Sequence, residues 1–181
     1  MKKHPAYMIG FLAIVGIICA TLLSVVNAIT YPIILENEFK SLNATLSALD
    51  VQVTEDLTEE LEKDKNMLDG VNNVYAGVHA DSTNCYVFEV NANNNFTSFK
   101  VLVVISKEDG KILTLSTVGE SGFTTHGKDS LFKGNDFGLT NSTSSSLDAN
   151  FISVSGATVS SDSILVAVKL AYKQLEVLGG K

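Results

Sequence analysis

The sequence contains few of the residues from which metal sites and disulfides are built. Only two cysteines, Cys19 and Cys85, and three histidines occur in 181 residues. No group of these residues has metal-ligand spacing, so we predict no metal site. The cysteines lie on opposite sides of the end of an apolar segment, which argues against an intramolecular disulfide. We therefore expect Cys85 to pack as a small apolar residue.

Positive charge is also scarce. Lysine and arginine total 13 against 20 aspartates and glutamates, for a net charge of -7. Nucleic acids and anionic lipid surfaces are bound by clustered cations, and no basic stripe occurs in this sequence. We therefore predict no nucleic-acid partner. The many serines and threonines lack the His and Asp spacing of a hydrolase triad.

Charged residues are absent from Pro5 to Leu35. The most apolar part, Tyr7–Val26, has the length that spans the hydrocarbon core of a bilayer. The alternative is a cleaved signal peptide, since Val26-Asn27-Ala28 resembles a small-residue cleavage site. The apolar run is longer than a usual signal-peptide core, which favours an uncleaved anchor.

The charges that flank this run indicate its orientation. Lys2 and Lys3 precede it, and Glu36 and Glu38 follow it. The positive-inside rule then predicts a single-pass cell-membrane protein with a cytoplasmic N-terminus. The expected parts are a cytoplasmic N-terminus (1–6), a transmembrane helix (7–30), a helical connection (31–70) and an extracytoplasmic domain (71–181).

Hydrophobic spacing predicts helices on both sides of a set of strands. An apolar stripe at intervals of three and four predicts a helix that continues from the anchor, with Leu35, Phe39, Leu42, Leu46 and Leu49 on one face. Glu55–Met67 is expected to form a second, acidic helix that ends at Asp69-Gly70. A final helix is predicted over Ser160–Leu178, with one apolar face made by Ile164, Val168, Ala171, Leu175 and Leu178.

Four segments between these helices have the character of strands. Two hairpins are expected, one around Asp81–Asn84 and one around Lys107–Gly110. The strands are Val74–Ala80, Cys85–Val90, Phe99–Ser106 and Ile112–Val118. Asn91–Asn95 is expected to be a polar loop. Together the elements predict an α+β fold, with helices packed on an antiparallel sheet.

A long segment rich in Gly, Ser, Thr and Asn, Gly119–Asn150, separates the last strand from the final helix. It is too long for a simple connection, and such loops are often functional. Phe132 and Phe137 within it are expected to pack against the domain.

The tetrapeptide Ser155-Gly156-Ala157-Thr158 stands just before the final helix. Small residues allow backbone to approach a ligand closely, and a helix N-terminus attracts phosphate. The hydroxyl of Thr158 can form a phosphoester. The alternative is a plain turn in which Ser160, Ser161 or Asp162 caps the helix.

Four motifs occur in a fixed order along the chain. Asn27-Ala28-Ile29-Thr30 follows the apolar run, and Asp109-Gly110-Lys111-Ile112 forms a strand turn. Glu120-Ser121-Gly122, with Gly127 beyond, comes next, and Ser155–Thr158 comes last. With these motifs the sequence resembles the FMN-binding proteins of the Rnf-type ferredoxin:NAD oxidoreductase. It is similar also to the related FMN-binding proteins of the sodium-pumping NADH:quinone oxidoreductase.

The resemblance implies FMN bound covalently, with its phosphate esterified to Thr158. It implies cofactor contacts from the residues around that threonine and from the Glu120 loop, namely Ser155, Gly156, Ala157, Val159, Ser160, Glu120, Ser121 and Gly122. The chain differs from the family pattern at Ile152, where the family carries Asp. It also has Asn94–Thr97 in place of a Gly-Tyr-Gly-Gly segment.

The function implied is electron transfer within an ion-translocating ferredoxin:NAD oxidoreductase complex. The protein would be an electron-transfer component rather than an enzyme by itself, with no catalytic residues of its own. Multi-span membrane subunits would be its partners, and a flavin transferase would attach the FMN. Two alternatives are a stand-alone extracytoplasmic electron-transfer flavoprotein and a membrane-anchored interaction module without flavin.

Overall fold

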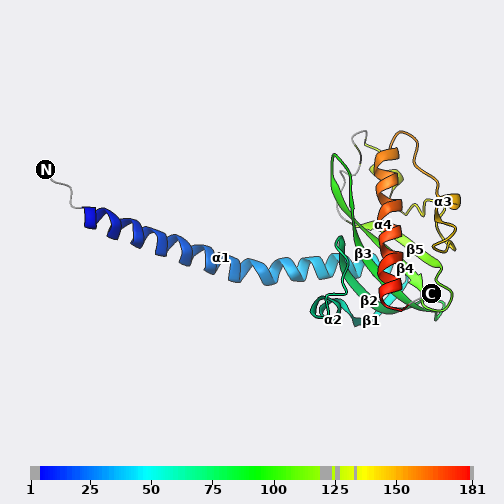
Figure 1. Cartoon of the computed structure of the whole chain (residues 1–181), viewed down its shortest axis with the longest axis horizontal. Helices are drawn as coiled ribbons and strands as arrows, with labels where there is room; N and C mark the ends of the chain where they lie inside the picture. The colour runs from blue at the N-terminus through cyan, green and yellow to red at the C-terminus, as the bar shows by residue number, and fades with distance from the viewer. Residues whose placement is uncertain (1–4, 119–123, 125–126, 133, 180–181) are drawn as a thin grey trace. The chain divides into compact units, whose positions relative to one another are not determined.

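The computed structural model describes residues 5–118, 124, 127–132 and 134–179, and within them the side chains of 5–8 and 31–45 are not described. The chain forms two compact units, Met1–Asn43 and Ala44–Lys181. Figure 1 shows the helix of the first unit in blue and the mixed helix and sheet domain of the second from cyan to red.

The first unit is dominated by α1, which spans Pro5–Ala48. Its segment Ile9–Thr30 is long and apolar enough to cross a membrane, and a signal sequence near the N-terminus has the same character. The hydroxyls of Thr21 and Thr30 each donate a 2.7 Å hydrogen bond to a carbonyl four residues earlier in the helix. Even the polar side chains described here therefore suit an apolar surrounding.

The second unit contains a five-stranded antiparallel sheet in which neighbouring strands are consecutive in sequence. The strands are β1 (Val51–Asp56), β2 (Val71–His79), β3 (Asn84–Asn93), β4 (Ser98–Ser106) and β5 (Ile112–Val118). Both predicted hairpins are confirmed. In the β4–β5 turn, Gly110 has a φ of 64°, a conformation that favours glycine.

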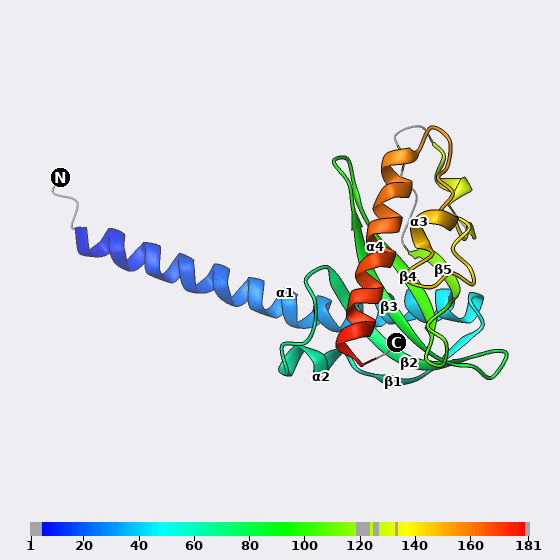
Figure 2. The same ribbon diagram turned by 45° about the vertical axis from the view of Figure 1, so that its right-hand side comes forward.

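Helix α4, Thr158–Val177, crosses one face of the sheet (Figures 1 and 2). Its predicted apolar face is confirmed, because Ile164, Val168 and Ala171 are fully buried. They pack in one core with residues of successive strands, among them Val74, Phe88 and Val103. The predicted α+β fold, an apolar N-terminal helix followed by an antiparallel sheet with packed helices, is therefore correct.

The region between α1 and β2 differs from the prediction. A helical connection was expected over 31–70, with an acidic helix over Glu55–Met67, but Val51–Asp56 forms β1, and helix α2 is confined to Thr58–Lys63. Only Val51 of β1 is buried, so the strand lacks the alternation that would reveal it. Its position depends on Gly77, where a Cβ would lie 2.7 Å from the carbonyl oxygen of Gln52. The sheet therefore begins ahead of residue 71, and the other predicted boundaries stay predictions.

The described part of the long segment after β5 contains two short helices, η1 (Asp129–Leu131) and α3 (Leu147–Asn150). Phe132 and Phe137 are buried, with ring centroids 5.3 Å apart in an edge-to-face arrangement. The prediction that these rings pack against the domain is confirmed.

Candidate functional site

The tetrapeptide Ser155–Thr158 forms the turn into α4. Gly156 has a φ of 77°, and Ala157 is the N-cap residue. The predicted start at Ser160 is wrong, because α4 begins at Thr158. Ser160, Ser161 and Asp162 therefore lie inside the helix and cannot be its N-cap.

The first turn of α4 has backbone amides suited to an anion. The first hydrogen bond of the helix runs from Ser161 N to Ala157 O, at 3.0 Å. The amides of Thr158 and Val159 precede it and have no acceptor within the helix. Ala157 carries only a methyl group and cannot cap them as Ser or Asp would. The positive end of the helix dipole adds to their attraction for negative charge.

Ser161 holds the turn in place. Its hydroxyl accepts a 3.0 Å hydrogen bond from Val154 N and donates one of 3.1 Å to Ala157 O, and the side chain is fully buried. Ser160 and Ala157 are buried too, whereas Ser155, Gly156, Thr158 and Val159 are exposed. Thr158 is therefore an exposed residue of a firmly held turn.

Lys128 reaches this turn from the long segment and was not predicted as a site residue. Its ammonium group donates a hydrogen bond to Ser155 O. A Cβ on Gly156 would lie 2.7 Å from Lys128 Nζ and 3.2 Å from its Cε. No local sequence pattern signals this contact, because Lys128 and Ser155 are 27 positions apart.

The β3–β4 turn also contacts the start of α4. Asn94 Nδ2 donates to Ser160 Oγ at 3.2 Å, and Ser163 Oγ donates to Asn93 O at 3.1 Å. The Asn94 side chain also accepts hydrogen bonds from the Phe96 and Thr97 amides. The segment that departs from the family pattern thus contacts the first two turns of α4. Figure 2 shows the β3–β4 turn and the start of α4 at the same end of the domain.

Glu120, Ser121 and Gly122, predicted to contact the cofactor, lie outside the described residues. Strand β5 ends before them at Val118, which pairs with Lys100 of β4. Lys100 is two residues from the start of β4, next to the β3–β4 turn. The described chain thus leaves the sheet at the end where α4 begins.

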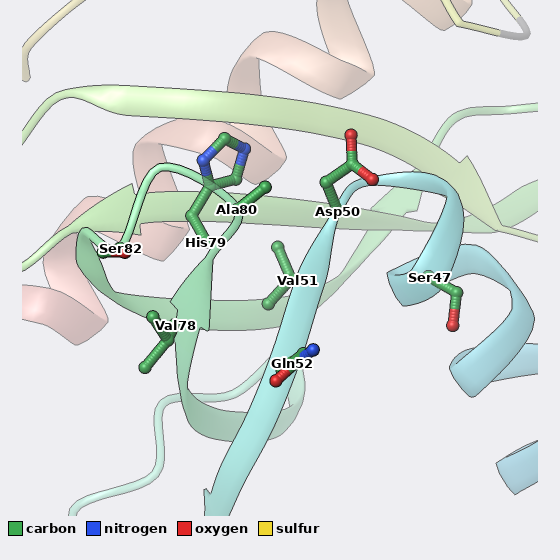
Figure 3. A pocket seen from close by; sticks show the side chains of 8 residues that line it. All are labelled: Ser47, Asp50, Val51, Gln52, Val78, His79, Ala80 and Ser82. Atoms are coloured by element: carbon green, nitrogen blue, oxygen red, sulfur yellow. The ribbon is translucent and has the colours of Figure 1, made fainter.

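A separate pocket of about 400 Å³ lies at the other end of the sheet (Figure 3). It is lined by Ser47, Asp50, Val51, Gln52, Val78, His79, Ala80 and Ser82. Beside it, His79 Nδ1 and Asp81 Oδ1 are 3.0 Å apart. Strand β3 begins near this pocket and ends near α4, and its ten residues span roughly 30 Å at ~3.3 Å each. The pocket is therefore not part of the site around Thr158.

Two further predictions concern metals and cysteines. Among the described residues, no group of three or more His, Cys, Asp or Glu side chains is placed to hold a metal ion. Cys85 is fully buried, as expected of a small apolar residue, and burial raises the pKa of its thiol to about 11. The thiol is therefore protonated at neutral pH.

Fold and geometry define an α+β domain whose last helix begins at an exposed turn of small residues. Residues 97–173 match the sequence model of the FMN-binding domain family. An FMN-binding domain is therefore present in this chain. The match extends from the β3–β4 turn into α4 and includes Lys128 and the tetrapeptide Ser155–Thr158. No curated protein matches the chain.

Proposed function

We propose that this protein is a membrane-anchored flavoprotein that carries FMN as a phosphoester on Thr158. It passes electrons within an ion-translocating ferredoxin:NAD oxidoreductase complex. One observation carries the proposal. The exposed Thr158 hydroxyl is on the first residue of α4, within the segment that matches the FMN-binding domain.

The residues around Thr158 suit the phosphate group. The amides of Thr158 and Val159 can donate to its oxygens, and Gly156 beside them is exposed. Ser155 and Ala157 set the path of the turn, with the buried methyl of Ala157 packed in the core. From the family resemblance, Glu120, Ser121 and Gly122 would border the ring system. Bound FMN supplies one- and two-electron transfer, and the protein supplies its position and surroundings.

Attachment is a phosphoryl transfer. The Thr158 Oγ1 attacks the flavin-side phosphorus of a flavin dinucleotide on the transferase. The new O–P bond replaces the pyrophosphate O–P bond, and the nucleoside monophosphate leaves. The hydroxyl proton passes to a base of the transferase. Ile152, where the family has Asp, is 67 % exposed and lies on the approach to the tetrapeptide, so the transferase must accept an apolar side chain there.

The apolar helix supports the membrane part of the proposal. We infer that α1 is an uncleaved anchor with its N-terminus in the cytoplasm, because Lys2 and Lys3 precede it. A single span without charged side chains cannot conduct ions alone, so multi-span subunits would supply the ion path. A reporter fused after Lys181 should be active only outside the cytoplasm. Activity in the cytoplasm, or a mature chain that begins at Ile29, would contradict this topology.

The test of attachment is the intact mass of the full chain from cells that contain a flavin transferase. The chain should be heavier by one FMN less water, with the added mass on the peptide that contains Thr158. Ser155→Ala is the matched control, because it removes the other exposed hydroxyl of the tetrapeptide and should leave the flavin in place. An unmodified wild-type chain would refute the covalent proposal.

Purification in mild detergent separates the two electron-transfer functions. Co-purification with multi-span membrane subunits supports a role in a translocating complex. A flavinylated chain that purifies alone, and reduces soluble acceptors without membrane subunits, would instead support the stand-alone flavoprotein.

A further inference from the structure

We propose that Lys128 is the cation that holds the phosphate of FMN at the start of α4. In this role it is a positioning residue, and the end of its side chain lies over Gly156. The inference rests on the proposed FMN site and adds a residue that the sequence motifs do not include.

The composition of the chain limits which side chains can meet a phosphate. The sequence contains no arginine, so a strong cationic partner must be a lysine. The lysine that reaches the tetrapeptide among the described residues is Lys128, through its hydrogen bond to Ser155 O. An ammonium group has three donors, so two remain for phosphate oxygens.

Lys128 differs in its charge environment from the four described lysines that form ion pairs. Four described lysines form ion pairs with carboxylates: Lys63 with Glu59, Lys100 with Glu89, Lys111 with Asp109 and Lys169 with Asp148. None of the ion pairs among the described residues includes Lys128. Its ammonium group instead lies near the positive end of the α4 dipole. Two positive charges together are unfavourable unless an anion binds between them.

The backbone that carries Lys128 is held in position. Lys128 N donates a 2.8 Å hydrogen bond to Thr124 Oγ1, and Thr124 N donates one of 2.7 Å to Asp129 Oδ1. Gly127, with a φ of 64°, makes the turn just before the lysine. A cation fixed in this way loses less conformational freedom when it binds a phosphate.

The packing against Gly156 explains that residue. A Cβ there would lie 2.7 Å from Lys128 Nζ, closer than atoms can approach without a shift. Any larger residue would push the ammonium group away from the start of α4. Glycine therefore serves two needs, the positive φ of the turn and the space for Lys128.

A phosphoester on Thr158 carries one negative charge and two non-bridging oxygens. Lys128 can neutralise this charge, while the amides of the first turn of α4 donate to the same oxygens. The lysine would act before attachment too, by binding the phosphate of free FMN.

The test uses the full chain from cells without flavin transferase, titrated with FMN and with riboflavin, which lacks the phosphate. Lys128→Ala should weaken FMN binding about tenfold or more, as expected for the loss of a charge-assisted hydrogen bond. Riboflavin binding should not change. Lys173→Ala, which removes an exposed lysine near the other end of α4, should leave both affinities unchanged. Lys128→Arg should restore most of the FMN affinity.

A second measurement is the rate of covalent flavin attachment, followed by intact mass, with transferase present and the flavin dinucleotide at a limiting concentration. Lys128→Ala should slow this rate about tenfold, with rescue by Lys128→Arg. Equal FMN affinity and equal rate in wild type and Lys128→Ala would overturn the role of Lys128 alone. Equal losses for FMN and riboflavin would also overturn it, because they would indicate a structural role. A wild-type chain that binds no FMN and is never modified would overturn the proposed function together with this inference.

Discussion

The two ends of α4 show a clear contrast in how they are bonded to the domain. Near the C-terminal end, buried Gln174 accepts from Leu68 N at 2.8 Å and donates to Asn66 O at 3.0 Å. Tyr172 OH lies 2.8 Å from Gly110 O and 2.9 Å from Ser142 O, which links three segments. At the N-terminal end, the first-turn amides have no acceptor within the helix, and the nearby Lys128 has no carboxylate partner among the described ion pairs.

In the proposed function, one helix serves structure at one end and binding at the other. Polar groups at the C-terminal end are satisfied within the protein, so they add stability and specify how α4 meets the sheet. At the N-terminal end, the side chains of Ser161 and Ser163 are also bonded to the domain, while no side chain caps the helix. The following predictions test this separation, from the largest expected effect to the smallest.

Thr158→Ala should abolish covalent flavin completely, because the side-chain oxygen of the ester is lost. Stability of the apoprotein should change by ~1 kcal/mol or less, since Thr158 is exposed. Thr158→Ser should retain some attachment. Intact mass and urea unfolding of the same preparations measure both effects. Covalent flavin on the Thr158→Ala chain would show that another residue is the attachment site.

Gln174→Ala should have the opposite effects to Thr158→Ala, with a large loss of stability and no loss of flavin attachment. It leaves Leu68 N and Asn66 O without their partner, so the free energy of unfolding should fall by about 2–4 kcal/mol. The flavin should still attach under conditions where the domain is folded. Exposed Lys173→Ala next to it should cost less than about 0.5 kcal/mol. Loss of flavin attachment in folded Gln174→Ala would show that the two ends of α4 are not separate.

Cys85 predicts how stability depends on alkaline pH. Burial raises the pKa of its thiol from its ordinary value of 9.0 to about 11. As the pH rises, the unfolded chain therefore loses this proton before the folded chain does. The contribution of the thiol to the free energy of unfolding is fully present below pH 9 and is lost between pH 9 and 11. It amounts to about 2–3 kcal/mol. The free energy of unfolding, measured with urea at each pH across this range, should fall less steeply for Cys85→Ala than for wild type. Identical slopes would mean that the thiol is ionised in the folded protein too.

Glu120→Ala should have the smallest effect and act only on the flavin. From the family resemblance, it should shift the absorbance or the redox potential of the flavin while the covalent bond remains. Spectra and potentiometric titration of the attached flavin measure this. If both are unchanged, Glu120 is a solvated carboxylate without a role at the ring.

Several elements were predictable from the sequence because their signals are local. The two hairpins have turn residues between apolar runs, and α4 has apolar residues at helical spacing. The prediction of Thr158 as the attachment site also depends on a local signal, since Ser155–Thr158 is a continuous motif. The boundary of α4 was displaced by two residues, because Ser160 and Ser161 resemble caps in the sequence but bond to Asn94 and Val154 in the structure.

Other features are determined by contacts between distant segments. Strand β1 exists because its backbone pairs with β2 across Gly77, although its own sequence pattern does not alternate. Asn94–Thr97 differs from the family sequence, yet Asn94 still contacts the first turn of α4.

The amino-acid sequence by itself determined the α+β composition, the apolar N-terminal helix and the threonine to which FMN would attach. These depend on the periodicity and chemistry of neighbouring residues. The tertiary structure alone decided that Lys128 lies over Gly156 and beside Ser155. The physical reason is that the direction of a surface lysine depends on the fold of the segment that carries it. That segment is held against the core by buried Phe132 and Phe137.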